Sequence, residues 1–460
     1  MDPRITALFR PQSIAVVGVS RKPDKIGRIV FENIVLSGFK GKVYPVNPLA
    51  REIMGYKVYP SLESLPEPVD LVVIAVPAPL VPDVMRQACV KEAKAAIVIT
   101  AGFSEIGNTE LEEKVANIAR LCGIRVLGPN VFGVIYTPEN LNATFGPRDV
   151  AQGNVAILTQ SGALGLALLY WFTRQPGLGV SAMVSLGNMV DIDFSDLLEF
   201  FGEDKHTKII AVYMEGLHRN GRKFVEIASK VNKKKPVLVL KAGKYTHGAR
   251  AVASHTGSLA GSYEAYKAAF RRAGIVEVDN LPDLLDTLKL FSMQPINEKI
   301  RHGLMILTNG GGLGVMAADA ADHLGVNLVQ LEPSTKEKIS KLLPWFASKS
   351  NPLDTTASIA AEKYVEVLHT LIDDDKIPAI LAIYAELPNM PVDPLDNAAN
   401  EIAKHAREQD KLLVLVMLGG EKTMHTAAKF ERNGIPVYAS PYDAMKAIKH
   451  LLDYVKHAFQ

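Results

Sequence analysis

The chain has 460 residues, of which 48% are hydrophobic and 22% charged, which is the composition of a globular protein rather than a disordered one. One hydrophobic core does not organise so long a chain, so we expect roughly two to four domains. Basic and acidic residues nearly balance, at 51 and 49, and no basic stripe with interleaved aromatic residues occurs, which argues against nucleic-acid binding.

The first residues, MDPRITALFRPQS, lack the charged and then apolar pattern of a secretion signal. The longest apolar stretch, residues 69–81, is interrupted by Pro77 and Pro79, so we expect no contact with a membrane. Cys89 and Cys122 fall in predicted helices, where we expect buried free thiols in a reducing compartment. The 11 histidines form no zinc-type motif, so we expect no metal site. These features predict a cytoplasmic protein.

Strand-like and helical runs alternate along the whole chain, and the strands are almost continuously apolar, as strands buried on both faces are. In the first third the predicted strands are residues 13–19, 41–47, 69–76, 95–102 and 124–130, with helical patterns such as 108–123 between them. The middle third repeats the pattern with strands at 154–160, 180–188, 208–216, 236–243 and 274–280. The last third has strands at 303–312, 326–332, 378–386, 411–420 and 435–440.

This alternation predicts right-handed crossovers and parallel sheets, and turn-rich joints at 144–154 and 292–303 divide the chain into three parts. We therefore predict an α/β protein with three consecutive doubly wound domains, at residues 1–147, 148–298 and 299–460. Ligands of such sheets bind beyond the carboxyl ends of the strands, so the residues after each strand are the candidate site residues.

The glycine turn after the first strand, VGVSRKPDKIG, departs from the dinucleotide fingerprint. The glycine after Gly18 comes only at Gly27, and Asn47 stands where an acidic residue would hold a ribose. The helix start beside this turn, with basic residues nearby, suits the phosphates of a nucleotide other than NAD. The segments AVPAPLVPD, residues 75–83, and GPNVFG, residues 128–133, would line the same crevice.

Two later strands lead into helices through small polar residues. ILTQSGALG places Thr159, Gln160, Ser161 and Gly162 between strand and helix, and ILTNGGGLG places Asn309 and 310–312 at the same point. Both patterns predict anion sites in which free backbone N–H groups hold a phosphate. Neither is a Walker loop.

His255 lies in KAGKYTHGARAVASHTGSLAG, residues 241–261, which we expect to be a flexible loop at the mouth of a helix. Neutral imidazole is a nucleophile near physiological pH and can accept and donate a phosphoryl group. Glu215 follows a strand of the same predicted domain and can fix the tautomer of the ring. Taken alone, each residue has a plainer interpretation: His255 as a structural histidine, and Glu215 as a surface carboxylate.

Together these segments resemble the NDP-forming acyl-CoA synthetases, relatives of succinyl-CoA synthetase, over essentially the whole chain. VPAP, GPN and QSGALG are similar to the CoA-binding α chain of that superfamily, and SHTGSLAG resembles its phosphohistidine loop in the ADP-forming acetyl-CoA synthetases. NGGGLGVMAADAA and NPLDTT, residues 351–356, resemble its second phosphate-binding domain. Val131 stands where the family pattern has a cysteine, so the resemblance does not identify the residues of the acyl pocket.

The resemblance implies a Rossmann-like CoA-binding domain followed by two flavodoxin-like domains. His255 and Glu215 are then the catalytic residues. The implied contacts to CoA are Gly18, Ser20, Arg21, Lys22, Lys25, Gly27, Asn47, Pro48, Val76, Pro77, Ala78 and Asn130. The implied contacts to phosphate are Gln160, Ser161, Gly162, Asn309, Gly310, Gly311 and Gly312.

The same resemblance implies an α subunit that converts acyl-CoA, ADP and phosphate into acid, ATP and CoA. An ATP-grasp β subunit would bind Mg-ADP or Mg-ATP and complete an α2β2 heterotetramer. Two alternatives from other classes are a CoA-sensing scaffold that has lost turnover and an NAD-dependent oxidoreductase. A ligand-induced thermal shift by CoA but not by NAD would separate the last of these from the others.

Overall fold

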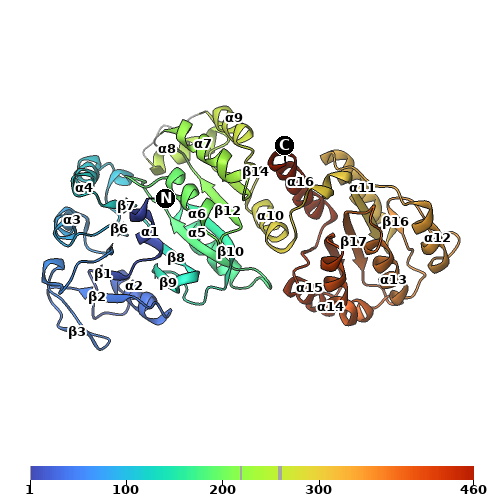
Figure 1. Cartoon of the computed structure of the whole chain (residues 1–460), viewed down its shortest axis with the longest axis horizontal. Helices are drawn as coiled ribbons and strands as arrows, with labels where there is room; N and C mark the ends of the chain where they lie inside the picture. Colours follow the sequence, from blue (N-terminus) through green and yellow to red (C-terminus); the bar gives the residue numbers. More distant parts are fainter. Residues whose placement is uncertain (1, 218–219, 257–261, 460) are drawn as a thin grey trace. The chain divides into compact units, whose positions relative to one another are not determined.

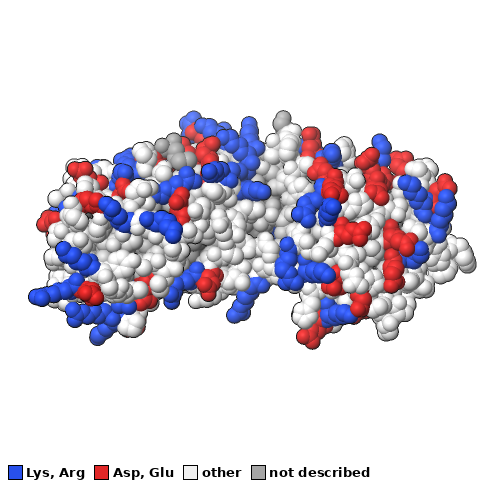
Figure 2. Space-filling view, turned by 60° about the horizontal axis from the view of Figure 1, so that its bottom comes forward, with Lys and Arg blue, Asp and Glu red and all other residues white. Residues whose placement is uncertain are grey.

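The computed structural model describes residues 2–217, 220–256 and 262–459, and for residues 253–256 it describes the backbone alone. The chain forms two compact units, Met1–Arg174 with Gly179–Glu277, and Gln175–Leu178 with Val278–Gln460. Figure 1 shows their helices and strands. On the face drawn in Figure 2, basic and acidic side chains are interspersed, as expected from their nearly equal numbers. None of the helices in the described part of the chain is long and apolar enough to span a bilayer.

The first sheet is a five-stranded parallel sheet with the strand order β2-β1-β5-β6-β7. Its strands are β1 (Ser13–Val17), β2 (Lys42–Val46), β5 (Leu71–Ile74), β6 (Ala95–Val98) and β7 (Arg125–Leu127), and its helices are α1 (Pro3–Phe9), α2 (Ile26–Leu36), α3 (Val81–Val90) and α4 (Thr109–Cys122). A short hairpin, β3 (Glu52–Ile53) and β4 (Tyr56–Lys57), follows β2.

The second sheet also lies in the first unit and has the order β14-β13-β12-β10-β11-β8-β9. Its strands are β8 (Gly133–Tyr136), β9 (Leu141–Thr144), β10 (Gln152–Thr159), β11 (Val180–Ser185), β12 (Ile209–Met214), β13 (Val237–Lys241) and β14 (Val276–Val278). Its helices are α5 (Gly162–Phe172), α6 (Phe194–Glu203), α7 (Gly221–Asn232), α8 (Thr246–Thr256) and α9 (Tyr263–Ala273). The antiparallel strands β8 and β9 extend one edge of this sheet.

The third sheet belongs to the second unit and is parallel, with the order β16-β15-β17-β18-β19. Its strands are β15 (Leu304–Thr308), β16 (Leu353–Asp354), β17 (Ala379–Ala385), β18 (Leu412–Leu418) and β19 (Val437–Tyr438). Its helices are α10 (Leu281–Met293), α11 (Gly311–Leu324), α12 (Pro333–Leu342), α13 (Ala361–Ile372), α14 (Asp393–Glu408), α15 (Glu421–Arg432) and α16 (Pro441–Ala458). The predicted class of three successive α/β sheets is confirmed, whereas the limits at 147/148 and 298/299 stay predictions.

The burial of β1 explains why the predicted strands read as unbroken apolar runs. Ile14 and Val16 belong to the hydrophobic cluster on one face of the sheet, and Ala15 and Val17 belong to the cluster on the other face. Side chains alternate between the two faces of a strand, so a strand covered on both faces needs an apolar residue at every position.

Two predictions, one about a strand and one about the cysteines, are wrong. Residues 326–332 are not a strand: Leu328 makes only an isolated bridge with Leu304, and the short strand β16 pairs with β15 instead. Cys89 and Cys122 do lie in helices, α3 and α4, but they are not buried free thiols. The two helices pack side by side, which brings the Cα atoms of the cysteines to 5.5 Å, and the sulfur atoms form a disulfide.

Candidate functional site

The carboxyl ends of β1 and β2 are joined through the first glycine turn. The amide of Gly18 donates to the carbonyl of Val46 at 3.0 Å, and the side-chain amide of Asn47 donates to the carbonyl of Val19 at 2.7 Å. Asn47 therefore holds the end of β2 against the first glycine turn. Asn47 lies directly after β2, where the dinucleotide fingerprint has an acidic residue that holds a ribose.

Gly18 and Gly27 are required by close approach of the backbone. Gly18 has a φ of +97°, and a Cβ atom there would lie 2.4 Å from the carbonyl oxygen of Ala75. A Cβ atom on Gly27, in the first turn of α2, would lie 2.3 Å from the carbonyl oxygen of Gly18. The turn and the start of α2 are thus in direct contact, which directs backbone N–H groups of the helix start towards the crevice.

The predicted basic residues beside this turn, Arg21, Lys22 and Lys25, are all exposed, and the hydroxyl of Ser20 accepts a hydrogen bond from the amide of Lys22 at 3.1 Å. Pro48 is exposed at the end of β2. Cationic side chains that are free to move are suited to the phosphates of a nucleotide.

The other side of the crevice is built from the ends of β5, β6 and β7. Thr100 donates from its hydroxyl to the carbonyl of Val76 at 2.7 Å, and the amide of Asn130 donates to the carbonyl of Thr100 at 3.0 Å. Pro77 is exposed and Ala78 half-buried after β5. The structure therefore brings the predicted CoA contacts to one edge of one sheet, and it adds Thr100, which the sequence analysis did not single out.

The turn between β10 and α5 is closed by the hydroxyl of Thr159. This hydroxyl accepts a hydrogen bond from the amide of Ser161 at 3.0 Å and donates to the carbonyl of Ser161 at 2.9 Å. The side chain of Ser161 caps α5 by accepting from the amide of Leu164 at 3.3 Å, and Gly162 is the first residue of the helix. The turn holds the first N–H groups of α5 at the carboxyl end of the sheet.

The turn between β15 and α11 in the second unit has the same construction. The hydroxyl of Thr308 accepts from the amide of Gly310 and donates to its carbonyl, both at 3.0 Å. The side chain of Asn309 is fully buried and is bonded to the amide and the carbonyl of Ala385, both at 2.8 Å. Nothing lies within 4 Å of a Cβ atom built on Gly312, whereas one built on Gly311 would lie 2.9 Å from a carboxylate oxygen of Asp354, so the helix start is open at Gly312 and bordered by Asp354 at Gly311. The similarity of the two sequence motifs thus corresponds to a similarity of geometry.

Gln160 joins the first of these turns to Glu215. Its side-chain oxygen accepts hydrogen bonds from the amides of Glu215 and Gly216, at 2.6 and 3.0 Å. Its side-chain nitrogen is buried and has no hydrogen-bond partner among the described residues. A buried donor of this kind costs free energy when it is left unpaired, which makes it a candidate contact for a bound anion.

Glu215 is buried, with 5% of its surface exposed, and is not the surface carboxylate of the alternative interpretation. Burial, the charge of Glu215 and a hydrogen bond to it raise the pKa of Tyr213 to about 12, so the phenol remains a donor to the carboxylate. The ammonium of Lys241, at the end of the neighbouring strand, donates to the carbonyl of Glu215 at 2.9 Å. Sequence reasoning missed Tyr213 and Lys241, although a lysine that ends an apolar strand was a visible signal.

The backbone of His255 lies in α8, so the segment up to residue 256 is a helix and the predicted loop is wrong for this part. Local propensity explains the difference, because alanine and arginine residues of the segment favour a helix. The side chain of His255 and residues 257–261 lie outside the described residues, and the predicted role of this histidine stays a prediction.

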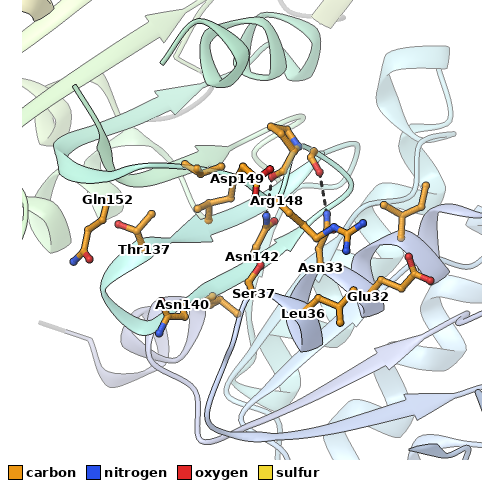
Figure 3. Close-up of a pocket in the computed structure, with 16 residues that line it drawn as sticks. Glu32, Asn33, Leu36, Ser37, Thr137, Asn140, Asn142, Arg148, Asp149 and Gln152 are labelled. Atoms are coloured by element: carbon orange, nitrogen blue, oxygen red, sulfur yellow. Dashed lines mark hydrogen bonds between the residues drawn. The ribbon is translucent and has the colours of Figure 1, made fainter. Parts of the chain in front are cut away.

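A cavity of about 900 Å³ lies away from these strand ends, between the C-terminal half of α2, the β8–β9 hairpin and residues 146–152. Figure 3 shows Asn33 and Asn142 in its wall. Asn33 donates to the carbonyls of Thr144 and Gly146, and Asn142 donates to the carbonyl of Pro147. None of the predicted site residues lines this cavity. We therefore do not assign the functional site to it, despite its size.

Three family models match the chain in sequence order. Residues 12–137 match a CoA binding domain, residues 152–291 match the succinyl-CoA ligase like flavodoxin domain, and residues 304–457 match the Ligase-CoA domain. The matched CoA binding domain includes the crevice at the ends of β1, β2, β5, β6 and β7.

The chain is similar to curated proteins over nearly its full length. It is 41% identical to the α subunit of acetate–CoA ligase [ADP-forming] I from Pyrococcus furiosus, with 98% of each chain covered. It is 40% identical to acetate–CoA ligase [ADP-forming] from Methanocaldococcus jannaschii, over 98% of this chain but 64% of the relative. That relative therefore continues beyond the part that this chain matches.

A solved structure agrees with the fold. The dinucleotide-forming acetyl-coenzyme A synthetase 1 of Ca. Korarchaeum cryptofilum, in complex with phosphate and ADP, matches with a TM-score of 0.94 and 40% identity. The match covers 99% of this chain and 97% of the other.

Proposed function

The chain belongs to the family of ADP-forming acetate–CoA ligase α subunits, and on that premise we propose that it carries a phosphoryl group on His255 between acyl phosphate and ADP. The proposed overall reaction converts acyl-CoA, ADP and phosphate into acid, ATP and CoA. The observation that carries this proposal is the pair of matching turns, at Thr159–Gly162 and at Thr308–Gly312, each of which presents the N–H groups of a helix start.

CoA is proposed to bind at the crevice of the first sheet. The glycine turn at Gly18 and the start of α2 would hold phosphates, with Arg21, Lys22 and Lys25 as mobile cations. The family match to a CoA binding domain over residues 12–137 supports this assignment. Asn47, in place of an acidic residue, disfavours the NAD-dependent alternative.

The chemistry is proposed to proceed in three transfers. An oxygen of phosphate attacks the thioester carbon, the carbon–sulfur bond breaks, and CoA leaves as acyl phosphate forms. A ring nitrogen of His255 then attacks the phosphorus, and the phosphorus–oxygen bond to the acyl group breaks to release the acid. Finally an oxygen of ADP attacks the phosphorus, and the nitrogen–phosphorus bond breaks to give ATP.

Apart from His255, the residues of this chain have to position the reacting groups and neutralise charge, because phosphoryl transfer depends mainly on those effects. Gln160 would hold the phosphate with its free side-chain nitrogen, beside the helix start at Ser161 and Gly162. Glu215, fixed by Tyr213, would stabilise the imidazolium as His255 gains positive charge. The turn at Asn309–Gly312 would serve as the second phosphate cradle.

A partner subunit is proposed to supply the nucleotide site, with an ATP-grasp fold, bound Mg-ADP and an α2β2 assembly. The α-subunit name of the Pyrococcus relative and the longer single chain of the Methanocaldococcus relative support a separate second part. The acyl group is left open.

The test uses the chain co-purified with its ATP-grasp partner and incubated with ATP labelled on the γ-phosphate. We expect a label on this chain that survives base and is lost in acid, as a nitrogen–phosphorus bond is. His255→Asn should abolish the label and the net reaction and leave the affinity for CoA unchanged. The matched control His247→Asn, on the same helix, should keep both, and a label that persists in His255→Asn would refute the assignment.

A further inference from the structure

Lys241 is a buried cation at the carboxyl end of β13, with 3% of its surface exposed. Lysine is almost never buried to this extent unless its ammonium is paired. Here the ammonium donates to the carbonyl of Glu215 at 2.9 Å and to the carbonyl of Ala242, and it lies 4.6 Å from the centre of the Tyr266 ring. Two backbone carbonyls and one aromatic face thus share a single ammonium group.

These three contacts belong to three separate segments. Glu215 follows β12, Ala242 begins the connection from β13 to α8, and Tyr266 lies on α9. The hydroxyl of Tyr266 in turn accepts a hydrogen bond from the amide of Leu217 at 3.0 Å, two residues beyond Glu215. Lys241 therefore ties the segment that bears Glu215 to the segment that leads into the helix of His255.

The peptide groups on the two sides of Glu215 are both held. Gln160 accepts from its amide at 2.6 Å, and Lys241 donates to its carbonyl. With both groups fixed, the direction in which the Glu215 side chain leaves the backbone is fixed as well. A displacement of about 1 Å at a reacting group can lower a rate on the order of 100-fold.

We propose that Lys241 is a positioning residue that sets the placement of Glu215 relative to the segment carrying His255. The proposal rests on the proposed function of these two residues, and its structural part concerns the contacts of Lys241 alone.

The charge of Lys241 gives the proposal a signature in pH. The charged groups that face it are Glu215 at the end of β12, Glu277 from β14 and Lys244 from the connection to α8, and the neighbouring phenol is that of Tyr266 on α9. Burial is the main cause that lowers the pKa of Lys241 to about 8, and the two carboxylates oppose it. Above that pH the neutral amine donates weaker hydrogen bonds than the ammonium, so the three segments are held less firmly.

The chain offers a matched control at the opposite end of the same strand. Lys235 precedes β13, and its ammonium also donates to two backbone carbonyls, those of Phe201 and Asp204, at 2.8 and 2.6 Å. Lys235 makes the same kind of contact at the amino end of the sheet, away from Glu215. Lys235→Met therefore removes a comparable clamp without touching the candidate site.

The first measurement is hydrogen exchange followed by mass spectrometry, which does not depend on turnover. In Lys241→Met we expect the amides of residues 215–217 to exchange at least about tenfold faster than in the wild type, together with those of the connection to α8. Lys235→Met should leave these amides unchanged. Unaltered exchange at residues 215–217 in Lys241→Met would overturn the proposal, whether or not the proposed function is correct.

The second measurement is the rate of chain labelling by ATP in the complex with the partner subunit, from pH 6.5 to 10. We expect the wild-type labelling rate to fall above an apparent pKa near 8, and Lys241→Met to lower this rate about 10- to 100-fold and to lose that limb, while the affinity for CoA, measured by titration, stays unchanged. Lys241→Arg should restore part of the labelling rate and move the limb to higher pH, since a guanidinium stays protonated. A wild-type limb that persists in both variants would refute a positioning role for Lys241, whereas a wild type that is never labelled would refute the proposed function instead.

Discussion

Replacing Gly27 by alanine tests the crevice proposed for CoA. The new Cβ atom would lie 2.3 Å from the carbonyl oxygen of Gly18 and 2.8 Å from its carbonyl carbon, and both atoms are backbone. Relief of this contact requires the turn and the start of α2 to separate by about 1 Å, because nonbonded carbon and oxygen atoms need more than 3 Å. Overpacking of this kind costs about 1–3 kcal/mol.

The same separation acts directly on the proposed phosphate contacts, since the turn and the helix start both belong to them. If the whole cost falls on the bound state, the affinity for CoA decreases about 5- to 150-fold. Isothermal titration with CoA measures the change, and chemical unfolding followed by circular dichroism measures the stability of the same sample. Labelling of the chain by ATP should persist, because that step uses the second sheet.

Gly38→Ala is the matched control, because it lies just past the other end of the same helix. Its φ is +86°, so an alanine is strained there by about 1 kcal/mol, but nothing lies within 4 Å of the added carbon. Gly38→Ala should lose some stability and bind CoA as the wild type does. If Gly27→Ala also binds CoA with wild-type affinity, the crevice at Gly18 is not the CoA site.

Three further changes test other parts of the structure. Glu215→Gln should lower ADP- and phosphate-dependent release of CoA on the order of 10²–10⁴-fold without changing CoA affinity, and a wild-type rate would exclude Glu215 from the mechanism. Cys89→Ser opens a disulfide with a sequence separation of 33 and should lower the free energy of unfolding by about 3–4 kcal/mol; a reductant should do the same to the wild type but not to the variant. Burial raises the pKa of Asp286 from 3.8 to about 6, so the native state binds more protons than the unfolded state and loses stability as pH rises from about 4 to 6. Asp286→Asn should therefore raise the free energy of unfolding by roughly 1 kcal/mol at pH 7 and by nothing near pH 4, and an equal gain at both pH values would contradict this linkage.

The sequence by itself determined the succession of strands and helices. A strand such as Ser13–Val17 is apolar at every position because both of its faces are buried, and helices such as Thr109–Cys122 end at a glycine, Gly123, in the left-handed region. The threonine-containing motifs before Gly162 and Gly311 indicated two matching turns, and both exist. These signals are local, so they are readable within a few residues of the chain.

Only the tertiary structure decided which distant segments meet. The disulfide depends on α3 packing against α4, and residues 326–332 form only a bridge because they meet β15 at its first residue, Leu304, whereas Leu353–Asp354 pair with its last two residues. The burial of Glu215 between Gln160, Tyr213 and Lys241 likewise depends on β10, β12 and β13 lying side by side in a sheet whose order is not the order of the sequence. Periodicity specifies that a strand exists and which of its faces is apolar, whereas the neighbours of a strand are set by the packing of the whole sheet against its helices.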